Sequence, residues 1–260
     1  MKRKCQSIIN NLPALVTFLL VLLIWEILSD TGIVPSYMLP SPLDVIRALF
    51  TDRIMILSHA GVTLLEAVYG LLIGVLLAFF IATLMDRVPL LYRAFYPLMV
   101  ITQTIPTIAI APLLVLWMGF GMMPKITLVV ITTFFPITVG LLEGFGSVDQ
   151  DAIALMRSMG ASEMDIFRHV KFPEAIPYFF SGLKVSASYA VVAAVISEWL
   201  GGFVGLGVYM TRVKKAYAFD KMFAVILFII VISLALMGIV NLLRDWSMPW
   251  YKAERERLKD

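Results

Sequence analysis

Long apolar stretches alternate with short polar segments along most of the chain. An α-helix needs roughly 20 mostly apolar residues to cross a hydrocarbon layer about 30 Å thick. Six stretches meet this requirement and predict membrane-spanning helices at 12–29, 60–85, 92–118, 124–143, 177–200 and 222–243. The pattern therefore predicts an all-α polytopic membrane protein with about six transmembrane helices.

The third predicted span is the least regular of the six. It contains Pro97, Pro106 and Pro112, and a proline inside a helix removes one backbone hydrogen bond. Neighbouring helices must cover the carbonyl that is left without a partner in the membrane. We therefore expect this span to be kinked or split.

Composition agrees with a membrane protein. Hydrophobic residues make up 60% of the chain and charged residues 15%, whereas soluble domains are roughly 45–50% apolar. The single cysteine, Cys5, excludes an internal disulfide framework. With only His59 and His169 beside it, no metal site can be built from histidine and cysteine. We expect neither a metal nor a cofactor.

The first 30 residues resemble a secretory signal peptide, because the basic start "MKRKC" precedes an apolar run. However, no small-x-small cleavage site follows that run, which ends at Trp25, Glu26 and Ser29-Asp30. We therefore expect an uncleaved first transmembrane helix, and a cleaved signal peptide is the alternative.

Basic residues predict the orientation in the membrane. Six spans put both termini on one side, and a cytoplasmic placement leaves 14 of the 21 lysines and arginines in inner segments. The positive-inside rule then makes 1–11 and 244–260 cytoplasmic tails of one membrane domain, 12–243, with a cytoplasmic loop at 144–176. The basic residues between 212 and 221 are the main exception.

A short helix is expected on the outer side between the first two spans. Ser41 can cap it, Pro42 suits its first position, and Asp44 completes a capping-box pattern. Its expected apolar stripe consists of Leu43, Ile46, Leu49 and Phe50. We expect it to lie along the outer membrane surface.

The loop at 144–176 carries start and stop signals for two more short helices. In the first, Ser147 and Gln150 form a capping-box pattern and Gly160 offers the left-handed position that ends the helix. The expected apolar stripe of this helix is Val148, Ala152, Leu155 and Met159.

The second short helix begins with the same kind of signal. Ser162 and Asp165 form its capping box, Phe167 and Val170 share one face, and Pro173 is expected to end it. Two helices this short cannot bury both of their faces, so the pair must dock on the membrane bundle, on a partner, or on both. DNA binding by a helix-turn-helix is disfavoured because a basic face is missing, and we expect no nucleic-acid partner.

Acidic residues inside the spans need separate explanations, because each costs roughly 2.5–3.5 kcal/mol at the centre of a membrane helix. Glu26, Glu66 and Glu198 map near the outer ends of their spans, which favours interfacial or bundle-facing carboxylates. Glu198 is the one we place close to a transport pathway, because a glycine-rich turn follows it.

Other polar residues are further candidates for lining a pathway, with helix–helix hydrogen bonding as the alternative. They are Gln103, Thr104 and Thr107 beside the Pro106 break, and Ser186 and Tyr189 in the fifth span.

The run "MGASEMDIFRHVKFPEAIPYFFSGLK" resembles the cytoplasmic loop of permease subunits of ATP-binding-cassette (ABC) importers. The motif of that family reads Glu-Ala-Ala, three residues, Gly, nine residues, Ile, any residue, Leu-Pro. Gly160, Val170, Phe172 and Pro173 follow its second part, with Val and Phe replacing Ile and Leu. The Glu-Ala-Ala part is not matched, because its positions fall on residues 154–156, Ala-Leu-Met.

The resemblance extends over nearly the whole chain. The segments "YMLPSPLDVIRALF", "APLLVLWMGFGMMPKI", "FFPITVGLLEGF" and "SEWLGGFVGLGVYM" are similar to permeases that import sulfonates, taurine, nitrate, riboflavin or pyrimidine precursors of thiamine. It implies a type I importer permease in the cell membrane. The substrate would be a thiamine-precursor pyrimidine or another aromatic heterocycle, with a sulfonate, taurine or nitrate as the alternative.

The resemblance also implies partners. They are a second permease copy in a homodimer, two cytoplasmic ABC ATPase subunits, an outer solute-binding protein and membrane lipid. The residues implied in ATPase coupling are Leu155, Met156, Arg157, Met159, Gly160, Ala161, Glu163, Phe167, Val170 and Pro173. The chain itself is expected to be non-catalytic, and it has no GxxxxGK[ST] phosphate loop.

Two other classes of membrane protein fit less well. A six-span serine protease would need a Gly-x-Ser-Gly nucleophile, but Phe179 precedes Ser181-Gly182, and no histidine follows His169. A secondary carrier more often has ten or more spans in repeated halves. Neither class accounts for the capped helix pair in the loop.

Overall fold

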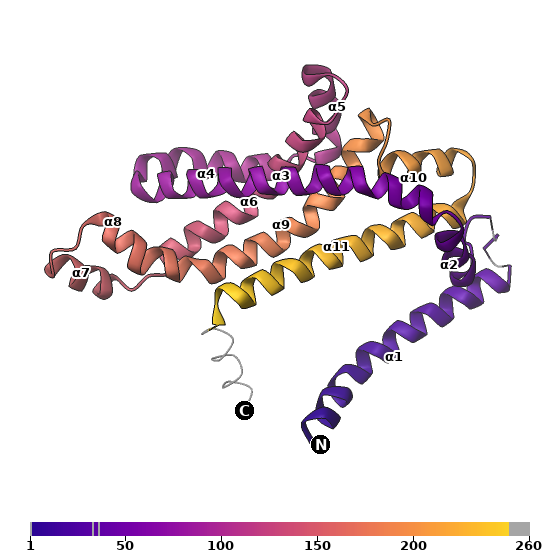
Figure 1. Ribbon diagram of the computed structural model, residues 1–260, viewed down its shortest axis with the longest axis horizontal. Coiled ribbons are helices and arrows are strands. Elements are labelled where there is room, and N and C mark those ends of the chain that lie inside the picture. The colour runs from indigo at the N-terminus through magenta and orange to yellow at the C-terminus, as the bar shows by residue number, and fades with distance from the viewer. Residues whose placement is uncertain (1, 33, 36, 250–260) are drawn as a thin grey trace. The chain divides into compact units, whose positions relative to one another are not determined.

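Every regular element of the described chain is helical in the computed structural model, which describes residues 2–249 except 33 and 36, with side chains from Leu12 onward. The helices are α1 (Lys2–Asp30), α2 (Pro42–Thr51), α3 (Arg53–Arg87), α4 (Pro89–Thr104), α5 (Thr107–Met118), α6 (Met123–Gly146), α7 (Gln150–Ser158), α8 (Glu163–Ile166), the π-helical turn η1 (Phe167–Lys171), α9 (Phe172–Gly201), α10 (Leu206–Lys215) and α11 (Phe219–Ser247) (Figure 1). Residues 250–260 of the expected carboxy-terminal tail lie outside the described residues.

Five of the six expected membrane spans are confirmed as long apolar helices, and the third corresponds to the helix pair α4 and α5. Five helices in the described part of the chain are long and apolar enough to cross a membrane, or six if the pair α4 and α5 forms one span. That pair bends by 101° at its break. Ile105 and Pro106 separate the two helices, so the expected split at Pro106 is confirmed.

The chain forms two compact units. One comprises residues 1–58 and 209–228, and the other comprises residues 59–208 and 229–260. We call them the small unit and the large unit.

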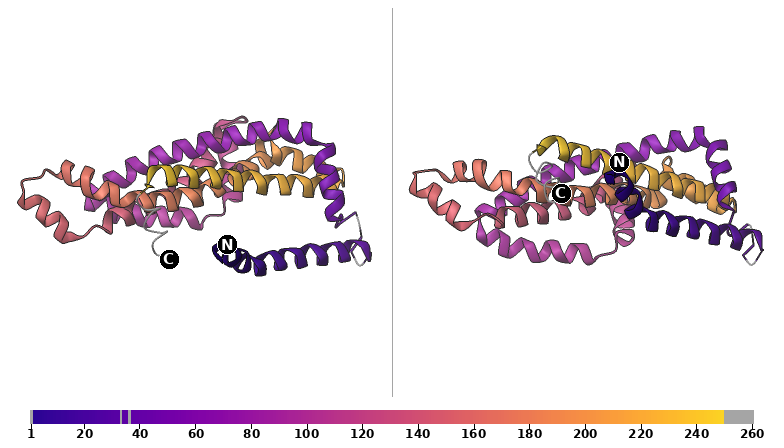
Figure 2. Two further views of the ribbon diagram at one scale, coloured as in Figure 1. Left: turned by 60° about the horizontal axis from the view of Figure 1, so that its bottom comes forward. Right: turned by 90° about the horizontal axis from the view of Figure 1, so that it is seen from below.

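The large unit has its core where α3, α6, α9 and α11 meet, with side chains such as Ala78, Leu141, Ala187 and Val240 buried there. Helices α6 and α9 pack along each other (Figure 2). A Cβ atom at Gly140 would lie 2.7 Å from the carbonyl oxygen of Tyr178. Small residues therefore let the two backbones approach closely, as is typical of helix packing in membranes.

The small unit contains the expected short helix, α2. Ser41 is its N-cap, accepting a 3.2 Å hydrogen bond from the backbone N–H of Asp44, and Pro42 occupies the first turn. The hydroxyl of Ser41 donates to the Asp44 carboxylate at 3.0 Å.

The buried face of α2 differs from the expected stripe. Val45 and Ala48 pack against Ala224 of α11, with Leu49 partly buried beside them. The other three stripe residues are exposed within the unit, namely Leu43, Ile46 and Phe50. The helix therefore has a second apolar face, which suits contact with lipid at the membrane surface.

Candidate functional site

The loop between α6 and α9 forms the expected pair of short helices, although one cap differs. Ser147 ends α6, where its hydroxyl donates to the carbonyl of Gly144 at 2.9 Å. The N-cap of α7 is Asp149, whose carboxylate accepts from Asp151 N–H at 2.9 Å. The expected capping box at Ser147 and Gln150 was wrong, because a charged carboxylate is a stronger acceptor at a helix N-terminus.

The turn between α7 and α8 follows the prediction. Gly160 has a φ of +83°, and the N–H groups of Gly160 and Ala161 donate to the carbonyls of Arg157 and Met156 at 3.0 and 3.1 Å. This pair of hydrogen bonds forms a Schellman motif, which needs a residue in the left-handed conformation. The expected capping box of Ser162 and Asp165 is also confirmed.

Pro173 does not end the second helix, contrary to the prediction. Helix α8 continues through η1 into α9, so that Glu163–Gly201 is one continuous helix of 39 residues. In η1 the N–H of Phe172 donates to the carbonyl of Phe167, one residue further back than in an α-helix. This wider turn accommodates the proline ring and its missing N–H.

The helix pair closes one face and exposes the other. Val148, Ile153 and Ile166 are buried between the helices, and Met156, Ala161 and Val170 pack against them. Leu155 and Met159 are 62% and 75% exposed. The expected stripe is thus divided: Val148 is buried and Ala152 half-buried, whereas Leu155 and Met159 point away from the core, because Ile153 takes the inward position on α7.

Charged and aromatic contacts hold the pair in place. Arg157 bridges to Glu163 across the turn at 2.9 Å. Phe167 packs against Phe145 at a tilt, with 5.4 Å between the ring centroids, and the Arg87 guanidinium lies 5.8 Å from the centroid of the Phe167 ring. Phe167 therefore packs at the base of the pair, on the side of the membrane helices.

An ion pair ties the same region to α3. The ammonium of Lys171 lies 2.9 Å from both carboxylate oxygens of Asp86. Lys171 belongs to η1 and Asp86 to the last turn of α3, so this pair links the base of the helix pair to a membrane-spanning helix.

The bend between α4 and α5 presents the expected polar residues. Gln103 and Thr104 are exposed, Thr107 is half-buried, and the Gln103 amide lies 3.5 Å from the carbonyl of Ile131. In α9, Tyr189 is exposed, whereas Ser186 is fully buried and donates to the carbonyl of Thr133 at 2.7 Å. In this structure Ser186 therefore contributes to helix packing, unlike the exposed candidates.

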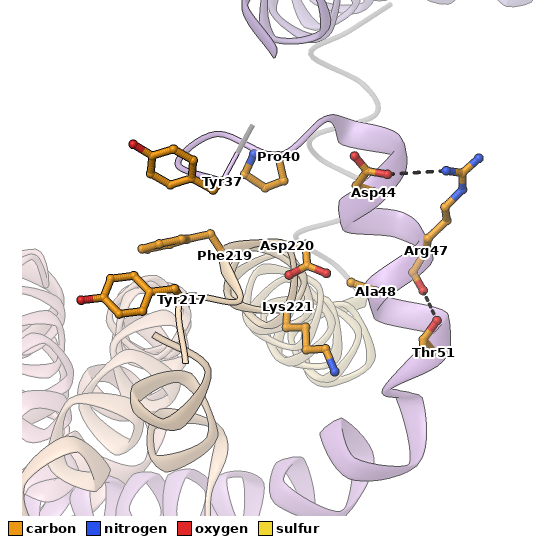
Figure 3. A pocket seen from close by; sticks show the side chains of 10 residues that line it. All are labelled: Tyr37, Pro40, Asp44, Arg47, Ala48, Thr51, Tyr217, Phe219, Asp220 and Lys221. Carbon is orange, nitrogen blue, oxygen red and sulfur yellow. Dashed lines mark hydrogen bonds and ion pairs between the residues drawn. The ribbon is translucent and has the colours of Figure 1, made fainter. Parts of the chain in front are cut away.

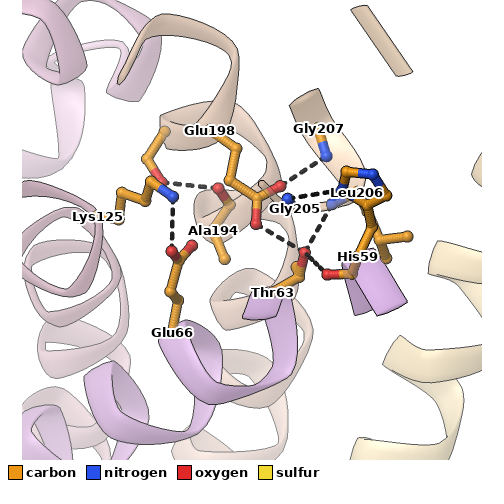
Figure 4. Close-up of polar contacts among 10 residues, drawn as sticks. His59, Thr63, Glu66, Lys125, Ala194, Glu198, Gly205, Leu206 and Gly207 are labelled. Carbon is orange, nitrogen blue, oxygen red and sulfur yellow. Dashed lines mark hydrogen bonds and ion pairs between the residues drawn. The ribbon is translucent and has the colours of Figure 1, made fainter. Parts of the chain in front are cut away.

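Glu198 lies at the opposite end of α9 from the helix pair and is 1% exposed. Its Oε1 accepts a 2.7 Å hydrogen bond from the hydroxyl of Thr63, and its Oε2 accepts one of 2.6 Å from Gly207 N–H (Figure 4). The carboxylate therefore joins α3 to the start of α10.

Three consecutive N–H groups, those of Gly205 and of the first two residues of α10, are bound by buried side chains. Besides the Gly207 bond, Leu206 N–H donates to Thr63 Oγ1 and Gly205 N–H donates to His59 Nδ1, both at 2.9 Å. Gly205 has a φ of +136°, and a Cβ there would overlap the Glu198 carboxylate. We call this set, His59, Thr63, Glu198 and residues 205–207, the polar latch.

A second buried carboxylate lies beside the latch. Glu66 pairs with Lys125 of α6 at 2.7 Å, and the two side chains are 1% and 6% exposed. The other carboxylate oxygen of Glu66, Oε2, has no hydrogen-bond partner among the described residues. Figure 4 shows the pair next to Glu198.

The sequence pattern predicts both buried carboxylates, but it does not identify Lys125, His59 and Thr63 as residues of the same region. An acid inside a membrane domain usually has a basic partner at the same depth. Lys125, at the start of its span, was the one available signal. Among the described residues, no group of three or more histidine, cysteine, aspartate or glutamate side chains could hold a metal ion.

The comparison with known protein families decides the class of this protein. Residues 70–249 match the family described as the inner membrane component of binding-protein-dependent transport systems. The chain belongs to this family. It is the permease subunit of an ABC importer and a multi-pass membrane protein.

Relatives and solved structures agree with this assignment. A probable ABC transporter permease of Haemophilus influenzae is 38% identical over 83% of this permease and 88% of its own length. The formylaminopyrimidine transport permease ThiX of Halalkalibacterium halodurans is 33% identical over 98% of this permease and 100% of its own length. The putative aliphatic sulfonates transport permease SsuC of Bacillus subtilis is 25% identical over 88% of this permease and 84% of its own length.

The fold is that of type I importer permeases. A chain in the crystal structure of an amino acid ABC transporter matches with a TM-score of 0.63 at 18% identity, covering 75% of the permease and 95% of that chain.

Proposed function

We propose that the permease moves a small organic solute into the cell, driven by ATP hydrolysis on partner ATPase subunits that dock on α7 and α8. One observation carries this proposal: Leu155 and Met159 are exposed on a helix pair whose other face is already packed. Two large apolar side chains on a capped, rigid element suit a protein partner. The permease itself supplies no nucleotide chemistry.

Motion of the ATPases would reach the membrane through α9. Helix α8, η1 and α9 are continuous, and Lys171 binds Asp86 of α3 at 2.9 Å. A displacement of the helix pair therefore acts on two membrane helices together. Glu198 lies at the far end of the same continuous helix, where the polar latch holds the turn at 205–207.

The remaining partners follow from the importer class. Two copies of the permease would form the pathway, and an outer solute-binding protein would deliver the solute. The excess of basic residues in inner segments supports cytoplasmic termini and a cytoplasmic helix pair. Gln103, Thr104 and Thr107 at the α4–α5 bend are our candidates for lining the pathway, since non-helical backbone at membrane depth suits a cavity wall.

For the substrate we propose a thiamine-precursor pyrimidine or another aromatic heterocycle. The supporting observation is that the formylaminopyrimidine permease ThiX aligns over its whole length with this permease. A sulfonate, taurine or nitrate is the alternative, supported by the more distant relative SsuC.

A charge on the exposed face of α7 tests the docking role. In Leu155→Asp the desolvated charge opposes docking, so ATPase co-purification and solute uptake should both fall at least about tenfold. Gln150→Glu is the matched control: it adds the same charge to α7, but in the first turn, where the helix dipole favours it. Normal co-purification and uptake in Leu155→Asp would contradict the proposal.

A further inference from the structure

A pocket of about 430 Å³ lies within the small unit, between α2 and the start of α11. Pockets that hold small molecules commonly measure roughly 300–1,000 Å³. Its walls come from the segment before α2, from α2 itself and from the turn between α10 and α11 (Figure 3). It shares no lining residue with the helix pair or the polar latch.

Three aromatic rings form one side of this pocket. Tyr37, Phe219 and Tyr217 lie one above another in Figure 3. The rings of Tyr217 and Phe219 are 6.3 Å apart between centroids, at 65° to each other. Tyr37 and Tyr217 are exposed within the unit. Accessible aromatic rings offer π-faces to a flat ligand or to a cation.

The backbone of Tyr217 indicates that its ring has a use. Tyr217 has a φ of +56° and is the one non-glycine residue with a positive φ in the described chain. Its N–H and that of Ala218 donate to the carbonyls of Lys214 and Val213 at 3.1 and 3.0 Å. Tyr217 thus fills the glycine position of a Schellman motif, at a cost of roughly 1–2 kcal/mol. Strain of this kind tends to occur at functional sites.

The charges that line the pocket are paired, with one exception. Asp44 lies 3.5 Å from Arg47, and the Lys221 ammonium lies 2.8 Å from Asp52. The carboxylate of Asp220 forms no hydrogen bond or ion pair with a described residue. In Figure 3 the carboxylate of Asp220 lies between Phe219 and Ala48 of α2, on the other side of Phe219 from its ring. The pocket therefore combines aromatic faces with one carboxylate that is available to a ligand.

We propose that this pocket binds a flat ring that carries an amino or ammonium group. The ring stacks on Tyr217, Phe219 or Tyr37, and the amino group donates to Asp220. The proposal rests on the importer function, because this ligand is the solute arriving at the outer side of the permease. It favours amino-substituted heterocycles over aliphatic sulfonates and nitrate, whose negative charge Asp220 repels, and over taurine, which has an ammonium group but no ring to stack.

Binding to the permease–ATPase complex in nanodiscs tests the site. The nanodiscs are made of phosphatidylglycerol, which has no amine. The probes are 4-aminopyrimidine and butylamine, and calorimetry measures their binding. We expect saturable binding of 4-aminopyrimidine, with butylamine at least about tenfold weaker because it lacks a ring to stack. Equal affinity would mean that the pocket takes an aliphatic ammonium from a protein or lipid, and it would overturn the proposal.

Two substitutions locate the binding. Asp220→Asn should weaken 4-aminopyrimidine binding about tenfold by removing the charged acceptor. Tyr217→Gly removes the ring and relieves the backbone, so it should weaken binding without loss of folding. Tyr217→Phe keeps the ring and should bind within about twofold of the unaltered protein. Asp245→Asn, at the other end of α11, is the charge control.

Undiminished binding in Tyr217→Gly and Asp220→Asn would overturn the site. This result is independent of the docking role, because it is measured by binding at the pocket. A pocket variant that loses the ligand but retains its ATPase supports the site and leaves the docking role intact. An unaltered permease that binds the ligand but never the ATPase contradicts the proposed function alone.

Discussion

The hydroxyl of Thr63 donates a 2.7 Å hydrogen bond to Oε1 of Glu198, although 135 residues separate the two along the chain. The same hydroxyl oxygen accepts the N–H of Leu206 at 2.9 Å. Thr63 therefore joins α3 to both sides of the turn between α9 and α10. It is the central residue of the polar latch.

Replacing Thr63 tests the latch directly. Thr63→Val keeps the volume but leaves Leu206 N–H and one Glu198 oxygen without a partner, which should cost about 1–3 kcal/mol of stability. Thr63→Ser keeps the hydroxyl and should cost less. Thermal unfolding in detergent measures both, and a loss in Thr63→Ser as large as that in Thr63→Val would contradict a dominant role of these hydrogen bonds, because only the methyl group is lost in Thr63→Ser.

Gly205→Ala should open the same turn. The added Cβ would overlap the Glu198 carboxylate, and the φ of +136° is unfavourable for alanine. We expect lower thermal stability and faster thiol labelling of a cysteine placed at Phe203. Gly61→Ala is the control, because a Cβ there meets nothing within 4 Å and a helical alanine should add roughly 0.5–1 kcal/mol. Unchanged labelling in Gly205→Ala would contradict the latch.

Removing one partner of the Glu66–Lys125 pair should destabilise the fold strongly, whereas removing both should destabilise it little. Lys125→Met leaves a buried carboxylate, 1% exposed, without its cation, and should cost about 3–5 kcal/mol. The double variant Lys125→Met with Glu66→Leu removes both charges and should regain most of this loss. A double variant as unstable as the single one would contradict this account of the pair.

Hydropathy and local signals predicted much of the fold because they act over short distances. The spans follow from apolar length, and the break at Pro106 follows from a missing N–H. Gly160 and the capping box at Ser162 involve only neighbours along the chain. Where two local signals competed the prediction failed, as when Asp149 replaced Ser147 as the cap and η1 absorbed Pro173.

The polar latch could not be assembled from sequence. Its partners come from α3, from the end of α9 and from the following turn, and the Glu66–Lys125 pair spans 59 residues. A single sequence carries no signal for such pairings beyond the expense of a buried acid. The inward position of Ile153 was missed for a local reason. Asp149 caps α7, so Val148 lies before the helix and does not share the helical period of the residues that follow.

Acid should weaken the small unit through Asp52. Burial alone would raise the pKa of Asp52, but hydrogen bonds from Lys221 and Tyr209 outweigh it and hold the pKa below its ordinary value. A lowered pKa stabilises the fold above the unfolded value, about 3.9, and this stabilisation is lost as pH falls through the folded value.

We therefore expect Asp52→Asn to be less stable than the unaltered permease at pH 7, with the difference shrinking as the pH falls below about 4. Unfolding midpoints measured between pH 7 and pH 3 provide the comparison. A constant difference across this range would show that Asp52 does not titrate as part of the ion pair with Lys221.

The geometry of the α7–α8 turn gives a further prediction. A Cβ at Gly160 meets open space, so only its φ of +83° opposes substitution. Gly160→Pro cannot adopt this φ and should disrupt the helix pair, reducing uptake while the protein still inserts. Gly160→Asn tolerates the left-handed region and should retain most activity. Uptake that is normal in Gly160→Pro would contradict a role for this turn in coupling.

Contact between the exposed face of α7 and the ATPase is the central claim, and cysteine cross-linking tests it most directly. Cys5 is the only native cysteine, so Cys5→Ser provides a background for single cysteines at Leu155, Met159, Glu163 and, as the outer control, Phe203. In membranes of the assembled transporter, we predict cross-links to the ATPase from positions 155 and 159, cytoplasmic labelling at 163, and no ATPase cross-link from 203. Labelling of position 163 from the outside, or the absence of any ATPase cross-link from 155 and 159, would contradict the account.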